Sequence, residues 1–148
     1  MRLVPVLLTL AACARPAPAT GRERLPAELR ARADESSVPV LLPRTMDLSR
    51  ASLIVESTYT ALSVPAPGIT VSLHTVRIAH EHPGVTAAGA PRPIRGGNGY
   101  VTVNEGIRVA TWTEDSVAYS LDLECAQAGD PRCADDTYLL SLVEELAP

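Results

Sequence analysis

The chain has no phenylalanine, no lysine and a single tryptophan among its 148 residues. Every basic residue is therefore an arginine, and the arginines are spread along the chain without a cluster. A protein that follows a phosphate backbone needs a basic patch or stripe, whereas the formal net charge here is −4. The composition therefore argues against nucleic acid as a partner.

Common catalytic signatures are missing as well. The sequence has no G-x-S-x-G elbow, no H-E-x-x-H pair and no Walker loop. Adjacent acidic residues occur at 114–115, 135–136 and 144–145, in expected turns or on a helix face, where carboxylates are usually solvated. We therefore expect neither an enzyme nor a bound cofactor.

The first residues have the organisation of a leader. Arg2 precedes an apolar run, residues 3–12, that is too short to span a bilayer as a helix and ends in "LAAC". The tetrapeptide Leu10-Ala11-Ala12-Cys13 resembles the lipobox of bacterial lipoproteins. This resemblance implies a signal peptide over 1–12 and a lipid on Cys13 that anchors an exported protein in a membrane, facing the periplasm or the cell exterior. Because Ala rather than Asp follows Cys13, it favours the outer membrane in diderm bacteria.

Residues 13–37 are rich in proline, alanine and charge and poor in large apolar residues. Such a segment buries too little apolar surface to offset the conformational entropy that is lost when a chain becomes ordered. Leu25 and Leu29 lie four positions apart and allow one marginal helical turn. We expect 13–37 to be a flexible tether and 38–148 to form a single domain.

From Val38 onward the pattern changes to short β-rich runs separated by turn residues. The last three runs follow each other closely and predict an antiparallel meander. In the final run, large apolar residues alternate with Ala118, Ser120 and Asp122, so one face is buried and the other is wetter. The runs cover 38–42, 51–64, 69–80, 99–104, 107–112 and 117–123.

The C-terminal residues predict an amphipathic helix that continues to Pro148. Asp135 or Asp136 is placed to cap its first turn. The fold class expected is α+β: a mostly antiparallel sheet with this one helix packed on one face. The apolar stripe comprises Leu139, Leu142, Val143 and Leu146.

Three motifs after Val38 resemble a β-rich module found in the extracytoplasmic parts of membrane-anchored bacterial regulators and in lipoproteins of unknown function. They are an early "LLP", the tryptophan-containing "ATWTEDSVAYSL" and the closing "LLSLVEEL". The resemblance implies a binding or sensing role and assigns no functional residue.

Cys125 and Cys133 stand eight positions apart across a loop that contains Gly129, Asp130 and Pro131. In an exported protein such a pair forms a disulfide, which would stabilise the fold by about 2.5 kcal/mol. A catalytic redox pair would have the closer C-x-x-C spacing.

All three histidines lie within "LHTVRIAHEHP". In an extended strand His74, His80 and His82 would point to one face, where they could share a zinc or copper ion with Glu56 or Glu81. We expect solvated histidines and no metal, and we keep a metal site at these three residues as an alternative.

The glycine-rich "IRGGNGY" precedes a strand, whereas a phosphate cradle opens a helix. We expect a bulge or hairpin entry, with Asn98 at positive φ. The aromatic residues Tyr59, Tyr100, Trp112 and Tyr119 fall within strands and are expected in the core or in cross-strand pairs.

The sequence thus predicts a lipid-anchored cell-envelope protein that serves as a non-catalytic binding or interaction module. Its partner is an unidentified envelope protein or ligand, beside the membrane that holds its lipid. Two alternatives remain: a periplasmic metal-binding protein that uses His74, His80 and His82, and a small envelope hydrolase.

Overall fold

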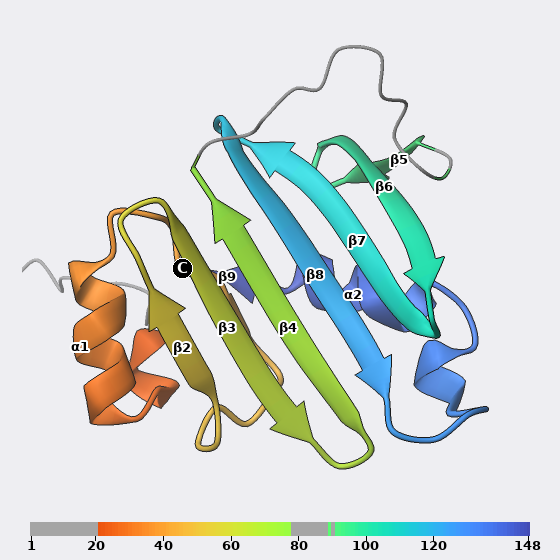
Figure 1. Cartoon of the computed structure of the whole chain (residues 1–148), viewed down its shortest axis with the longest axis horizontal. Coiled ribbons are helices and arrows are strands. Elements are labelled where there is room, and N and C mark those ends of the chain that lie inside the picture. The colour runs from red at the N-terminus through yellow and green to blue at the C-terminus, as the bar shows by residue number, and fades with distance from the viewer. Residues whose placement is uncertain (1–20, 78–88, 90) are drawn as a thin grey trace, which may run out of the picture.

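The computed structural model describes residues 21–77, 89 and 91–148 (Figure 1). Seven strands form one antiparallel sheet in the order β2-β3-β4-β8-β7-β6-β5, and two short strands, β1 and β9, pair separately. In chain order the elements are η1 (Arg22–Arg24), α1 (Ala27–Glu35), β1 (Leu42–Pro43), β2 (Ser52–Val55), β3 (Tyr59–Ala66), β4 (Ile69–Val76), β5 (Pro91–Ile94), β6 (Gly97–Asn104), β7 (Ile107–Glu114), β8 (Val117–Cys125), η2 (Pro131–Cys133), α2 (Thr137–Glu144) and β9 (Leu146–Ala147).

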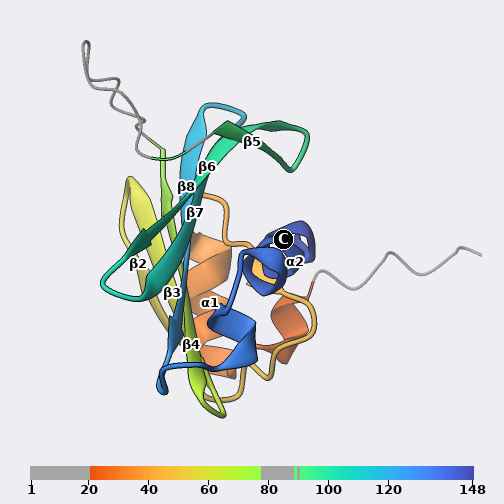
Figure 2. The same cartoon turned by 90° about the vertical axis from the view of Figure 1, so that its right-hand side faces the viewer.

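The molecule has two layers, and both α-helices lie on the same face of the sheet (Figure 2). α1 contacts β2 at one edge, whereas α2 contacts β5, β7 and β8. The side chains between the layers form one apolar cluster that includes Leu121 and Leu123 of β8 and Leu139 of α2. The expected α+β fold, a mostly antiparallel sheet with a C-terminal helix, is confirmed.

The meander expected for β6, β7 and β8 is present, with two-residue turns at Glu105–Gly106 and Asp115–Ser116. All four turn residues have positive φ, which suits the right-handed twist of the strands that they join. The run at 51–64 is interrupted near Glu56, so it forms two strands, β2 and β3.

The prediction of a flexible tether is wrong for residues 21–37. This segment forms η1 and α1, and Leu25 and Ala33 are 2% and 1% exposed. Leu29 and Ala33 lie four positions apart on one face of α1, and they pack against the core together with Leu25, which precedes the helix. The folded part therefore begins at or before Gly21 rather than at Val38.

The C-terminal helix is shorter than expected. α2 ends at Glu144, and the next residues form β9, which pairs with β1 through Leu42 and Ala147. The N-cap position of α2 is Asp136, whose side chain makes no capping hydrogen bond, whereas Asp135 accepts from the backbone N–H of Thr137, the first helical residue, at 2.8 Å.

β5 lies between the expected runs 69–80 and 99–104, where the sequence predicts no strand. It pairs with β6 through a two-residue turn at Arg95–Gly96, where Arg95 has φ 48° and Gly96 has φ 79°. Positive φ therefore occurs at Arg95 and not at Asn98, which lies within β6. The expected hairpin entry is present within "IRGGNGY", with Arg95 and Gly96 as its turn residues.

Candidate functional site

None of the described helices or loops covers the sheet face opposite α1 and α2, and one row of side chains crosses this face from β4 to β6 (Figure 2). His74 pairs with Ser120, Ser120 with Thr111, and Thr111 with Tyr100. Neighbouring residues along each strand, such as Leu73 and Leu121, point to the covered face. We call the uncovered side the open face.

A hollow of about 310 Å³ lies over this row and is open to solvent. Its wall combines an imidazole, hydroxyls, an amide and a phenol with the apolar side chains of Val76 and Ala118. This mixture of apolar surface and a few hydrogen-bonding groups is typical of small-ligand sites. The lining residues are His74, Val76, Asn98, Tyr100, Thr111, Trp112, Thr113, Ala118, Tyr119 and Ser120.

The polar groups beside the hollow already interact with each other. The Ser120 hydroxyl donates to Asp122 Oδ1 at 2.9 Å, and His74 Nε2 lies 3.9 Å from Asp122 Oδ2. The side chain of His74 is 51% exposed, so its imidazole can also contact a ligand. Asp122 therefore orients the serine hydroxyl and adds negative charge next to the imidazole.

An apolar strip borders the hollow at one end of the open face. Tyr59 pairs with Val76, and Val76 pairs with Ala118. Ile54, Tyr59 and Val76 are 52%, 40% and 36% exposed. Large apolar side chains grouped on a surface often mark a binding site. The hollow therefore has an apolar side as well as a polar one.

Below the hollow, on the covered face, Trp112 and Tyr119 are buried at 4% and 6% exposure. Burial raises the pKa of the Tyr119 phenol, and the carboxylate of Glu114 raises it further. Within the described residues, Trp112 Nε1 and Thr75 Oγ1 are buried without a hydrogen-bond partner. The expectation that these two aromatic residues belong to the core is confirmed, whereas Tyr59 and Tyr100 lie on the open face.

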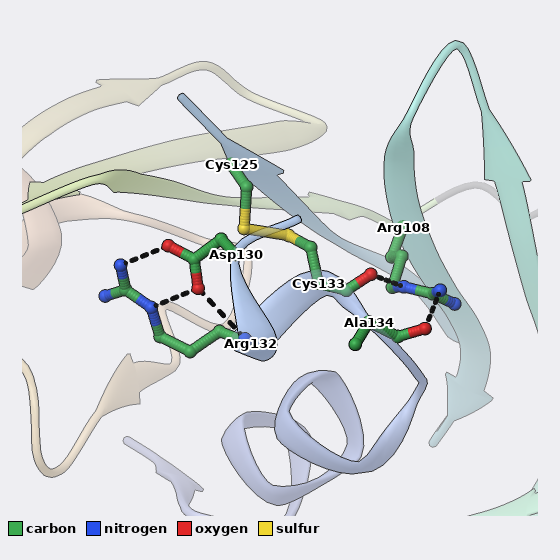
Figure 3. The surroundings of a disulfide bond; sticks show 6 residues. All are labelled: Arg108, Cys125, Asp130, Arg132, Cys133 and Ala134. Carbon is green, nitrogen blue, oxygen red and sulfur yellow. Dashed lines mark hydrogen bonds and ion pairs between the residues drawn. A yellow bond between two sulfur atoms is a disulfide. The ribbon is translucent and has the colours of Figure 1, made fainter. Parts of the chain in front are cut away.

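A second feature is the disulfide between Cys125 and Cys133, which joins the end of β8 to η2 (Figure 3). Inside the loop, Arg132 Nη2 donates to Asp130 Oδ2 at 2.6 Å. The hydrogen bonds from the side chain and the backbone of Arg132 lower the pKa of Asp130 to about 2. Arg108 of β7 donates to the carbonyls of Cys133 and Ala134 at 2.7 and 2.8 Å. The predicted pairing is present, and its surroundings serve to hold the start of α2.

Among the residues that the structure describes, no three His, Cys, Asp or Glu side chains gather where they could hold a metal ion. His74 lies on the open face, whereas His80 and His82 lie outside the described residues, as does Cys13. A metal site at the three histidines and the lipidation of Cys13 therefore stay predictions.

Sequence reasoning missed the hollow because its walls come from four strands. The alternation in 117–123 did indicate that Ser120 faces the wetter side. That Ser120 meets His74 depends on the β4–β8 register, which joins strands more than 40 positions apart in the sequence. No local pattern specifies such a pairing.

Within 21–77 and 91–148, no helix has both the length and the apolar character needed to cross a membrane. A comparison with known proteins identifies no relative. No protein-family model, no curated protein and no solved structure matches the chain.

Proposed function

We propose that this protein is a lipid-anchored lipoprotein of the cell envelope that works as a non-catalytic binding module through its open face. The anchor is the lipid on Cys13, and the binding element is the hollow bordered by His74 and Tyr100. The open face is the observation that carries the binding role, because the helices cover only the opposite face of the sheet.

The hollow suits one ring-sized group of a ligand. Its volume of about 310 Å³ is at the small end of ligand pockets, and the Tyr100 ring offers a surface for stacking. The hydroxyls of Thr111 and Ser120 and the amide of Asn98 can bond to polar substituents at the ring's edge. A sugar ring or an aromatic side chain of a partner protein has this combination of an apolar face and a polar edge.

Two observations support the envelope location. The sequence around Cys13 resembles a lipobox, and Cys125 and Cys133 form a disulfide. Disulfides form and persist in oxidising compartments outside the cytosol. The two arguments rest on different cysteines.

The anchor is tested by the intact mass of the protein from native membranes, measured with and without reduction before alkylation. We expect a chain that begins at Cys13 and carries acyl groups, with Cys125 and Cys133 alkylated only after reduction. An unprocessed chain without lipid would overturn the lipoprotein assignment.

The binding role is tested by NMR titration with two soluble probes, N-acetylglucosamine and N-acetyltyrosinamide. We expect one of them to shift the amide signals of Ser120 and Thr111, and Tyr100→Ala to abolish these shifts. Ser63→Ala changes another residue of the open face, outside the hollow, and is the matched control. If neither probe shifts these signals, the hollow does not bind ring-sized groups, and conversion of a probe to product would favour the hydrolase alternative.

The metal-binding alternative has its own test, because His74 is exposed beside the carboxylate of Asp122. Zinc and copper titrations compare the parent protein with a His80→Ala, His82→Ala double variant. Unchanged affinity in the variant rules out a site that uses the three histidines. A clear loss of affinity would favour metal binding over the proposed function.

A further inference from the structure

The start of the described chain is fixed on the helix-covered side of the sheet. η1, coloured red-orange, lies on the same side as α2 (Figure 2). A Cβ atom built on Gly21 would lie 3.7 Å from the carbonyl oxygen of Pro148, so this point is also beside the C-terminus. The chain therefore enters the domain on the side that faces away from the open face.

Several contacts hold this entry point. The Arg24 guanidinium donates to the carbonyls of Arg44 and Met46 at 2.7 and 3.1 Å, and Leu25 is 2% exposed. Arg22 also contacts Asp34 of α1 at 3.0 Å. Because η1 is tied both to α1 and to the segment after β1, Gly21 cannot move far from the helix layer.

The distance from the proposed anchor to this point is short. Only residues 14–20 separate Cys13 from Gly21. Seven residues span at most about 25 Å when fully extended, and a folded domain of this size is roughly 35 Å across. A tether over the whole of 13–37 would have reached about 85 Å at full extension. The folding of residues 21–37 therefore removes most of the expected reach.

We propose that the lipid on Cys13 holds the helix layer toward the membrane and presents the open face to the aqueous compartment. A domain turned the other way would need residues 14–20 at full extension around the edge of the sheet, which costs conformational entropy. The partner of the hollow is then a component that approaches from the aqueous side and not a lipid of the anchoring bilayer. This orientation rests on the proposed anchor at Cys13.

The composition of the chain makes the orientation measurable. With Cys125 and Cys133 bonded, Cys13 is the one free thiol, and the chain has no lysine. The chain beginning at Cys13, the mature form under the proposed function, is coupled through that thiol to a maleimide lipid in phosphatidylcholine vesicles. A single lysine then carries a donor dye, and a rhodamine lipid in the bilayer is the acceptor.

Two lysine positions are compared. Arg44→Lys places the dye on the exposed segment that Arg24 holds, and Ser72→Lys places it on the open face. We expect higher energy transfer from Arg44→Lys than from Ser72→Lys. The lysine-free parent, labelled at its terminal amine alone, provides the background. Equal transfer from the two positions, or higher transfer from Ser72→Lys, would overturn the proposed orientation.

A variant with a longer link tests whether the short link sets the orientation. Inserting about twenty Gly and Ser residues before Gly21 creates a flexible, longer link, which should make the two transfer efficiencies equal. If the difference between the two positions persists, the short link does not set the orientation. Because the lipid is attached chemically, these outcomes are independent of the native mass measurement, which alone decides whether Cys13 is lipidated in the cell.

Discussion

The indole ring of Trp112 stacks on the phenol ring of Tyr119, with centroids 5.1 Å apart and ring planes 9° apart. The β7–β8 register places the two residues directly opposite each other on the covered face. Such pairs contribute about 0.5–1.5 kcal/mol beyond the apolar area that they bury. The stack therefore supports, from below, the same two strands that carry Thr111 and Ser120 on the open face.

Tyr119→Ala should lower the free energy of unfolding by about 3–5 kcal/mol, as truncation of a buried aromatic side chain does. Urea denaturation followed by the fluorescence of Trp112, the only tryptophan, measures this loss. Tyr119→Phe keeps the ring and should lose less than about 1.5 kcal/mol. An alanine variant as stable as the parent would show that the stack does not support the sheet.

Gly99 has no room for a side chain. A Cβ atom there would lie 2.6 Å from both Ile94 Cδ1 and the Thr111 carbonyl oxygen. Because that oxygen belongs to the backbone of the sheet, Gly99→Ala should lower the free energy of unfolding by about 1–3 kcal/mol.

Gly97 is the matched control for this prediction, since its nearest neighbour, the Thr113 carbonyl oxygen, would be 3.6 Å from a Cβ atom. Gly97→Ala should change stability by less than about 0.5 kcal/mol. Thermal denaturation of the two variants measures both changes in stability. Equal stability of the two would mean that β6 shifts far enough from Ile94 and Thr111 to admit a methyl group.

Arg108 should be the arginine whose loss affects α2 most. Its side chain is 16% exposed and contacts Asp136 Oδ1 at 2.7 Å in addition to the two carbonyls near Cys133. Arg108→Met leaves these acceptors without their donor and should cost about 2–4 kcal/mol in urea denaturation. Arg22→Met breaks a more exposed pair and should cost less than about 1 kcal/mol. Similar losses in the two variants would contradict the role assigned to Arg108.

Reduction of the Cys125–Cys133 disulfide should lower the free energy of unfolding by about 2.5 kcal/mol, because it releases a constraint on the unfolded chain. Arg108 still holds the residues after Cys133, so α2 should stay in place. After reduction we expect the tyrosine and tryptophan bands of the near-ultraviolet circular dichroism spectrum to persist at low urea, with only the disulfide's own contribution lost, and a lower denaturation midpoint. Loss of the aromatic bands would mean that the disulfide alone positions α2.

The lowered pKa of Asp130 predicts a specific dependence of stability on pH. Arg132 holds the pKa of this carboxyl at about 2 in the folded protein, below its ordinary value of 3.8. The stabilisation is therefore complete above pH 3.8 and is lost as the pH falls toward 2. Asp130→Asn should reduce the loss of stability across this pH range in acid denaturation. If the parent and the variant lose stability equally, the Asp130–Arg132 contact does not contribute.

Local sequence patterns were sufficient for the elements with a strong periodicity. The alternation in β8 and the apolar stripe of α2 each bury one side, so their faces follow from spacing alone. α1 was missed because its buried face consists of only small or widely spaced residues, of which Ala33 is the most deeply buried. Its stability comes from tertiary packing, which composition does not reveal.

β5 and the hollow were missed for different reasons. Two of the four residues of β5 are prolines, which argue against a strand in any local reading. The hollow requires the pairing of His74 with Ser120, and a register between distant strands is set by the whole core. The sequence predicted a buried and a wetter face for the strand at 117–123, but neither which face stays free nor which residues meet on it.

The prolines of β5 also bear on how copies of this protein meet at high local concentration. Beside a two-residue turn, Ile94 exchanges backbone hydrogen bonds with Gly97, so Pro91 and Pro93 turn their backbone groups toward the outer edge. A strand from a neighbouring molecule would find no amide hydrogen at either position. If the proposed lipid on Cys13 holds copies side by side in a bilayer, β5 would therefore resist the edge-to-edge pairing through which exposed sheets aggregate.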